Sequence, residues 1–183
     1  MRKVIAAINM TLDAFCDHTA MIADEEIHDH YNDLLRNADT LIYGRITYQL
    51  MEDYWPSVVK HPIGIKASDE FAVLIDNIQK IVFSRTLQKV HWKNSELKAE
   101  LNKDEISNLK EQAGKNILVG SPGLIVALAE LGLIDEYQLA IQPTILGSGL
   151  PLFKNVTGRI NLQFLKTKTF ACGAVVHYYD AKK

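Results

Sequence analysis

Four short apolar runs constrain the fold of this chain more than any other feature of its sequence. The runs are Val4–Met10, Thr40–Tyr43, Lys80–Phe83 and Asn116–Val119. Each is rich in β-branched or aliphatic residues and is bounded by polar or small residues, which is typical of strands buried on both faces of a parallel sheet. Helical spacing of apolar residues fills the stretches between the runs, so the pattern predicts alternating strands and helices.

Helix signals occur at four places in the sequence. The first helix is predicted over 24–37, with Asp24 as its N-cap. The second starts at Thr47 and continues to Tyr54. The third is capped by Asn102 and ended by Gly114, and the fourth covers 122–131.

The last third of the chain has a different pattern. Strands are predicted over 136–146, 161–169 and 174–180, and the last two are joined through 171–173 in a hairpin-like connection. We therefore predict an α/β fold with a mostly parallel central sheet, helices on both faces and an antiparallel C-terminal hairpin.

Composition narrows the class of protein further. The chain has 183 residues, of which 48% are hydrophobic, and a net charge of −2. These values predict one domain over 1–183, and they give no reason to expect nucleic acid or an anionic membrane as a partner. No apolar stretch reaches transmembrane length. The two cysteines, Cys16 and Cys172, form no C-x-x-C pair, which argues against a zinc site or disulfide framework and favours a cytoplasmic setting.

Three predicted strand ends have features that suit phosphate binding. They are Gly44–Thr47, Ser84-Arg85 and Gly120–Leu124. Ligands of open parallel sheets bind at the carboxyl ends of the strands, glycine permits close approach, a helix N-terminus offers free N–H groups, and arginine matches phosphate. Each segment alone could be an ordinary turn, but together they predict a phosphate-bearing ligand. G-x-G-x-x-G is absent, so we do not predict a Rossmann domain.

Other candidate motifs give weaker signals. Asp13 follows the first strand and could orient a substrate, although it could also be a turn-forming residue. His28 and His30 look like a metal-binding pair, but residues two apart do not share a helix face, so no metal site is predicted. The sequence has no nucleophile elbow, no H-E-x-x-H and no Walker motif.

Taken in order along the chain, these segments resemble the dihydrofolate-reductase fold. The closer resemblance is to the reductase domain of the bifunctional riboflavin-biosynthesis enzyme. It is seen in Thr11-Leu12-Asp13-Ala14, in the Gly-Leu-Ile-Asp-Glu-Tyr run 132–137 and in Leu146-Gly147-Ser148-Gly149, which follows Pro143. The resemblance covers essentially the whole chain.

This resemblance implies a reductase that uses NADPH, bound across the carboxyl edge of the sheet. The implied cofactor-binding residues are Ala7, Gly44, Arg45, Thr47, Ser84, Arg85, Gly120, Ser121, Gly123 and Leu124. Ala7 would lie near the nicotinamide. The substrate would contact Asp13, His28 and Gly147, with Asp13 as the catalytic candidate for substrate orientation or proton supply.

Three departures from the family pattern leave the substrate open. Ala14 replaces the usual glycine, and His28 lies where a folate reductase has its pterin-binding carboxylate. The zinc motif of the deaminase half is absent from the sequence. A reductase of 5-amino-6-(5-phosphoribosylamino)uracil, a reductase of another small heterocycle or carbonyl compound, and a non-catalytic nucleotide-binding protein all remain possible. The resemblance also implies a homodimer, formed through 146–153 and the last two strands.

Overall fold

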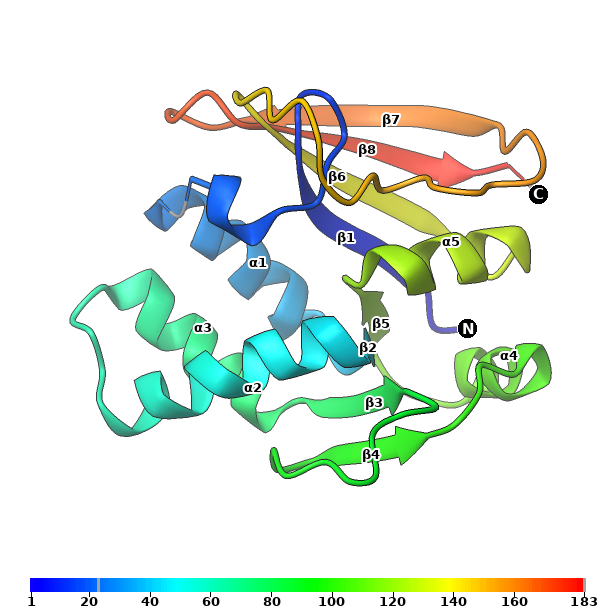
Figure 1. The fold of residues 1–183 in the computed structure, drawn as a ribbon, viewed down its shortest axis with the longest axis horizontal. Coiled ribbons are helices and arrows are strands. Elements are labelled where there is room, and N and C mark those ends of the chain that lie inside the picture. Colours follow the sequence, from blue (N-terminus) through cyan, green and yellow to red (C-terminus); the bar gives the residue numbers. More distant parts are fainter. Residues whose placement is uncertain (23, 183) are drawn as a thin grey trace.

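One eight-stranded sheet organises the chain in the computed structural model, which describes residues 1–22 and 24–182 (Figure 1). The strand order is β4-β3-β2-β5-β1-β6-β8-β7. The strands are β1 (Val4–Thr11), β2 (Ala38–Gly44), β3 (Gln79–Phe83), β4 (Ser95–Lys98), β5 (Asn116–Val119), β6 (Glu136–Gln142), β7 (Leu162–Thr169) and β8 (Val175–Ala181). β1 to β6 are parallel, whereas β8 is antiparallel to both β6 and β7. The predicted fold class is therefore confirmed.

Helices cover both faces of this sheet. They are α1 (Glu25–Arg36), α2 (Arg45–Lys60), α3 (Lys66–Asn77), α4 (Lys103–Glu111) and α5 (Pro122–Glu130), with a short 3-10 helix, η1 (His18–Ala20). Residues of α4 and α5 pack with one face of β1, and residues of α1, α2 and α3 pack with the other. None of the helices in the described residues is both long and apolar enough to cross a membrane.

Several elements differ from the sequence prediction, and the strand β4 was not predicted. α2 begins at Arg45, two residues before Thr47, because extended Gly44 is its N-cap, and it continues past Pro56 to Lys60. α3 was not predicted at all, although Phe71, Ala72 and Ile75 form a buried face on it. β6 ends at Gln142 rather than 146, because Pro143 has no N–H group to continue the ladder.

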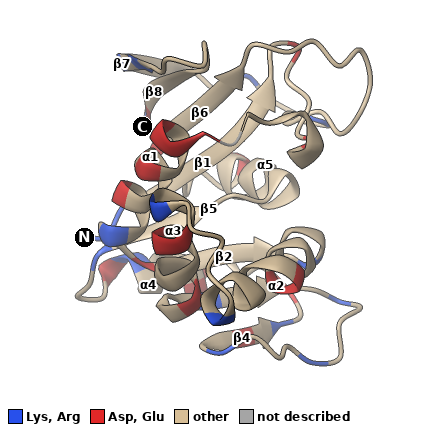
Figure 2. Cartoon of the chain, turned by 90° about the vertical axis from the view of Figure 1, so that its left-hand side faces the viewer, with Lys and Arg blue, Asp and Glu red and all other residues tan. Residues whose placement is uncertain are grey.

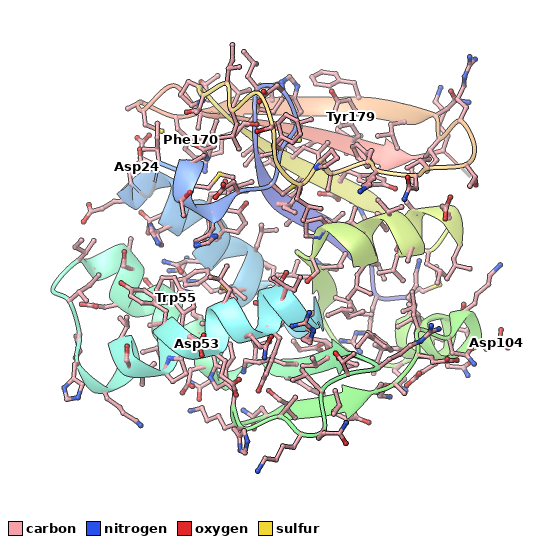
Figure 3. The ribbon with its side chains drawn as sticks, viewed as in Figure 1. Asp24, Asp53, Trp55, Asp104, Phe170 and Tyr179 are labelled. Carbon is pink, nitrogen blue, oxygen red and sulfur yellow. The ribbon has the colours of Figure 1, made fainter. Side chains whose placement is uncertain are left out.

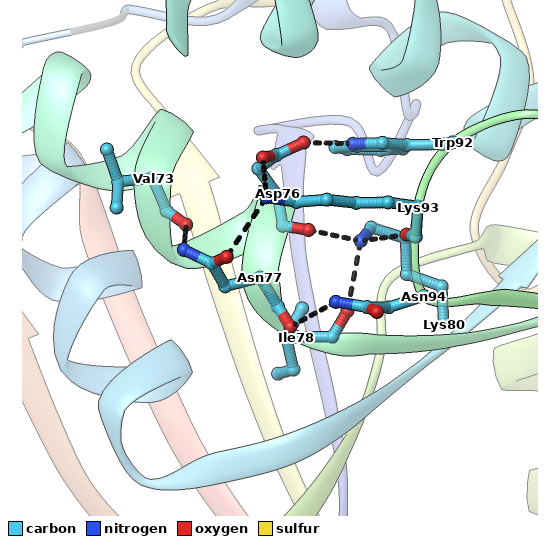
Figure 4. Close-up of polar contacts among 8 residues, drawn as sticks. All are labelled: Val73, Asp76, Asn77, Ile78, Lys80, Trp92, Lys93 and Asn94. Carbon is cyan, nitrogen blue, oxygen red and sulfur yellow. Dashed lines mark hydrogen bonds and ion pairs between the residues drawn. The ribbon is translucent and has the colours of Figure 1, made fainter.

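A buried lysine ties α3 to the connection between β3 and β4 (Figure 4). The Lys80 side chain is fully buried, and its Nζ donates to the carbonyl oxygens of Asp76 (3.1 Å), Ile78 (3.0 Å) and Lys93 (3.3 Å). The same nitrogen lies 4.2 Å from the centre of the Trp92 ring, whose Nε1 donates to the Asp76 carboxylate at 2.6 Å. Burial lowers the pKa of Lys80 to about 8, and the charge of Asp76 opposes this shift.

A second buried titratable group, His30, predicts an acid-sensitive fold. The ring of His30 packs against Tyr178 and Phe170, and burial lowers its pKa to about 4 from an ordinary value of 6.5. Between pH 6.5 and pH 4 the unfolded chain binds this proton and the folded chain does not. We therefore expect the free energy of unfolding to fall by up to about 1.4 kcal/mol per pH unit as the pH decreases through this window.

Urea unfolding at several pH values measures this slope. His30→Phe should remove the His30 contribution and flatten the slope, whereas His91→Gln, at an exposed histidine, should leave the slope as it is in the wild type. Equal slopes in the wild type and His30→Phe would contradict the prediction.

Candidate functional site

The carboxyl ends of β2 and β5 are joined by a hydrogen bond from a backbone amide to a side chain. The N–H of Gly44 donates to Oγ of Ser121 at 2.9 Å. A Cβ atom added at Gly44 would lie 3.7 Å from Cβ of Ser121 and 3.9 Å from a methyl of Leu124. These are ordinary van der Waals distances, so the turn after β2 packs against the start of α5 and a Cβ atom would also fit there.

The end of β5 also contacts the backbone of β1. A Cβ atom added at Gly120 would lie 3.2 Å from the carbonyl oxygen of Ala7, which leaves little room for any side chain there. Five of the residues that the resemblance implies for cofactor binding are therefore clustered at one place on the sheet edge: Ala7, Gly44, Gly120, Ser121 and Leu124.

Two helices begin at this cluster without a capping side chain. Asp24 caps α1 and Asn102 caps α4, but neither α2 nor α5 has a side-chain hydrogen bond at its N-cap. Ser121 is the N-cap of α5, yet its hydroxyl accepts from Gly44 instead. The first turn of α2 can therefore offer backbone N–H groups to an anion, whereas in the first turn of α5 Pro122 has no N–H and that of Leu124 bonds to the Ser121 carbonyl, which leaves the N–H of Gly123. Both helices point the positive end of their dipole at this cluster.

The two arginines lie on neighbouring strand ends of the same edge. Gly44 pairs with Phe83 in the β2–β3 ladder, so Arg45 and Ser84 follow paired residues. Arg45 donates to Gln49 at 3.0 Å, and Arg85 forms an ion pair with Glu100 at 3.2 Å. Both guanidinium groups belong to exposed residues and can exchange these partners for a ligand phosphate.

The remaining predicted cofactor residues differ in their surroundings. Oγ of Ser84 accepts from the N–H groups of Thr86 (3.1 Å) and Leu87 (3.0 Å), so it shapes the turn after β3. Gly123, in the first turn of α5, is exposed and has open space around it. Thr47 is half-buried in the first turn of α2, and Gly44 rather than Thr47 is the N-cap.

On the substrate side, the structure brings Asp13 and Gly147 together. The Asp13 carboxylate accepts from the N–H of Gly147 at 2.7 Å, from the N–H of Leu146 at 3.1 Å and from Oγ1 of Thr11 at 2.6 Å. The bond from Thr11 has the largest effect on the pKa of Asp13, and together with the two amides it lowers that pKa to about 2. Asp13 is therefore ionised at neutral pH.

His28 lies apart from this group, in an aromatic cluster between α1, α2 and α3. Its ring centre is 6.1 Å from that of Trp55 and 5.9 Å from that of Phe71, and Figure 3 labels Trp55 between these helices. Its Nδ1 lies 2.9 Å from the carbonyl oxygen of Asp24. A carbonyl only accepts, so Nδ1 carries the hydrogen and Nε2 of the neutral ring is left as an acceptor.

Several residues of these sites were not predicted from the sequence. Thr11 and Leu146 complete the contacts of Asp13, and Trp55 and Phe71 surround His28. The Thr-x-Asp spacing at 11–13 was a usable signal, since a hydroxyl two residues before a carboxylate can bond to it. Within the described residues no group of His, Cys, Asp and Glu could hold a metal ion.

Comparison with known proteins adds independent evidence. The RibD C-terminal domain family matches residues 2–176. The uncharacterized protein YyaP of Bacillus subtilis (strain 168) is 36% identical, over 97% of this chain and 94% of its own length.

Two solved structures share the fold at low sequence identity. A protein of Shewanella sp. PV-4 assigned to riboflavin biosynthesis has a TM-score of 0.75 and 18% identity, with 99% of both chains covered. The diaminohydroxyphosphoribosylaminopyrimidine deaminase/5-amino-6-(5-phosphoribosylamino)uracil reductase of Thermotoga maritima has a TM-score of 0.65 and 16% identity. The match covers 99% of this chain but only 57% of the Thermotoga protein.

Proposed function

Because this chain belongs to the RibD C-terminal domain family, we propose that it is an NADPH-dependent reductase whose substrate is 5-amino-6-(5-phosphoribosylamino)uracil or a close analogue. One observation supports the cofactor most strongly. Two uncapped helix N-termini meet where Gly44 and Ser121 are bonded, directly beside Ala7 and Gly120. Such a pair suits the pyrophosphate of a dinucleotide.

Three groups of residues along this sheet edge suit different parts of the proposed cofactor. The N–H groups that open α2 and α5 would bind the pyrophosphate, and Arg45 and Arg85 would bind the phosphate on the adenosine ribose. Arginine at two adjacent strand ends favours NADPH over NADH, because its planar fork matches an additional phosphate. The nicotinamide ring would lie over the neighbouring ends of β1 and β5, where Gly120 has no side chain to cover the sheet edge beside Ala7.

When bound, the cofactor would supply a hydride from its C4 atom to an electrophilic carbon of the substrate. The protein would supply orientation: Ala7 and Gly120 fix the plane of the nicotinamide, and the segments around Asp13 and Gly147 bound the space beyond it. A balanced reduction also needs one proton at the substrate atom that receives the electron pair.

The test is a cofactor oxidation assay with the full chain. We expect nicotinamide absorbance to decrease when NADPH and 5-amino-6-(5-phosphoribosylamino)uracil are mixed with the protein, and to decrease much more slowly with NADH. No decrease at saturating protein would exclude this substrate. No change in NADPH fluorescence on titration with protein would exclude the cofactor.

A second candidate, a reductase of another small heterocycle, is favoured by His28. The residue places an imidazole between aromatic rings, at a place where folate reductases have a carboxylate. Ala14, in contrast, keeps the left-handed backbone (φ 66°) that the family's glycine adopts freely, so the loop itself is not evidence for a changed substrate. A screen of heterocycles with NADPH distinguishes the two candidates.

We also propose that the partners are a small-molecule substrate and a second copy of the chain, in the cytoplasm. Acidic and basic segments neighbour each other on and around α1 and α3 in Figure 2, which does not suit a polyanion. Cys16 and Cys172 are both free thiols. Large apolar side chains are exposed on the edge strand β7 (Phe164, 56%) and on the loop after β6 (Ile145 and Leu150).

Replacing Phe164 by glutamate tests the proposed dimer. The Phe164 side chain is 56% exposed on β7, and a buried charge there would oppose association. Light scattering should give a dimer for the wild type and a monomer for Phe164→Glu. Val73→Glu, at an equally apolar exposed position on α3, should remain dimeric. A monomeric wild type would contradict the proposal.

A further inference from the structure

Two segments that are distant in sequence are bound together beyond the end of β1. The backbone of residues 11–16 and that of residues 144–152 are linked by three hydrogen bonds, two of which form an isolated antiparallel bridge between Phe15 and Pro151. The three bonds are Leu12 N–H to Thr144 O (2.8 Å), Cys16 N–H to Leu150 O (2.8 Å) and Leu152 N–H to Ala14 O (3.0 Å). The loop after β6 is thus held against the loop after β1.

The Asp13 carboxylate forms the side-chain link between these two segments. Both of its oxygens accept bonds, and two of its three donors are backbone amides of the opposite segment, those of Leu146 and Gly147. Gly147 has φ 78°, a left-handed conformation that points its N–H toward the carboxylate together with that of Leu146.

Thr11, at the end of β1, orients this carboxylate from the buried side. Thr11 is fully buried, its Oγ1 accepts from the N–H of Phe15 at 3.0 Å, and the same hydroxyl donates its hydrogen to Asp13 at 2.6 Å. The hydrogen bonds therefore run in one direction, from the Phe15 amide through the Thr11 hydroxyl to the carboxylate. Three donors leave Asp13 as a charge-assisted acceptor that has no proton of its own to give.

We propose that Asp13 is a positioning residue that holds the Leu146-Gly147 backbone against the end of β1, an arrangement called the clasp below. The clasp fixes the wall of the substrate half of the site. The proton of the reaction then comes from a group other than Asp13. That this wall borders the substrate rests on the function proposed above. The clasp itself rests only on the contacts of Asp13.

Asp13→Asn is the direct test, because the amide keeps the size of the carboxylate but turns an N–H₂ group toward one of its donors. We expect amide hydrogen exchange at Leu146 and Gly147 to become about tenfold faster, which is the effect of losing one charge-assisted hydrogen bond. In the reductase assay KM for the substrate should rise while the pH profile of kcat keeps its wild-type shape. Thr11→Val should reproduce both effects in weaker form. Thr11→Ser keeps the hydroxyl, so its exchange rates and KM should match those of the wild type.

Asp17→Asn is the matched control. Asp17 is an acidic residue of the same loop, but its carboxylate accepts from the N–H (2.8 Å) and hydroxyl (2.7 Å) of Thr19 rather than from the 144–147 segment. Exchange at Leu146 and Gly147 should be unchanged in this variant. Its circular dichroism also shows whether an Asp-to-Asn change in this loop is tolerated.

Two results would overturn the proposal. Unchanged amide exchange at Leu146 and Gly147 in Asp13→Asn would show that Asp13 does not hold this backbone in place, whatever the activity of the variant. Faster exchange combined with the loss of one limb of the kcat–pH profile would make Asp13 a proton carrier. If even the wild type oxidises no NADPH, the proposed function fails, and the exchange measurement still decides for or against the clasp.

Discussion

Gly120→Val is expected to reduce NADPH oxidation by at least about 100-fold, since displacing reacting groups by about 1 Å has effects of this size. Even a single Cβ atom at this position would lie 3.2 Å from the Ala7 carbonyl oxygen. The two further methyl groups of valine would fill the space in which we propose that the nicotinamide lies. The binding constant for NADPH, measured by fluorescence titration, should weaken along with the rate.

Two comparisons separate this effect from a general loss of structure. Gly158→Val should keep wild-type activity, because Gly158 has no left-handed backbone and nothing within 4 Å of an added Cβ atom. The urea midpoint of Gly120→Val is expected to fall, because the added Cβ atom crowds the Ala7 carbonyl oxygen, so NADPH binding and turnover are compared under conditions in which circular dichroism shows the variant to be folded. Wild-type turnover by Gly120→Val would show that the nicotinamide does not lie over Gly120 and Ala7.

Lys80→Met is expected to lower the free energy of unfolding by about 3 kcal/mol, the upper part of the range for leaving buried polar groups without their hydrogen-bond partner. Methionine can fill most of the space of the lysine stem, so a cavity contributes little to this loss. The loss comes from the carbonyl groups of Asp76, Ile78 and Lys93, which lose their shared donor inside the protein. The contact with the Trp92 ring is lost as well.

Urea unfolding followed by circular dichroism measures this change. Lys89→Met, at an exposed lysine in the same connection, should alter the free energy of unfolding by less than about 0.5 kcal/mol. A Lys80→Met variant within about 1 kcal/mol of the wild type would mean that water replaces the ammonium group among the three carbonyls.

Most of the sheet could be predicted from the sequence because its central strands are buried on both faces. Four of the strands, β1, β2, β3 and β5, coincide with continuous apolar runs that have no helical alternative of similar length. The edge strand β4 was missed, since its sequence Ser-Glu-Leu-Lys contains a single large apolar residue. α3 was missed because its charged residues Lys66, Asp69 and Glu70 interrupt the apolar pattern of its narrow buried face. That face packs against α1 and α2, and these contacts are known only once the chain is folded.

The same distinction separates the site residues that the sequence could predict from those that it could not. Strand ends and helix starts are local features, so the sequence alone predicted the positions of Gly44, Ser121 and Gly120. Contacts between distant segments are not local. Neither the bond from Asp13 to Gly147 nor the packing of His28 against Trp55 can be read from spacing, because 134 residues separate the first pair and separate helices hold the second.

The two uncapped helix starts also have a consequence for how stability responds to ligand. α2 and α5 lack the stabilisation that Asp24 and Asn102 give to α1 and α4, which for a capping side chain is about 1 kcal/mol per helix. A bound dinucleotide would act as the missing cap for both helices at once. Binding and folding are then thermodynamically linked, and NADPH at 100 times its dissociation constant would add about 2.7 kcal/mol to the free energy of unfolding. The melting temperature measured with added NADPH would therefore rise with the ratio of free NADPH to its dissociation constant.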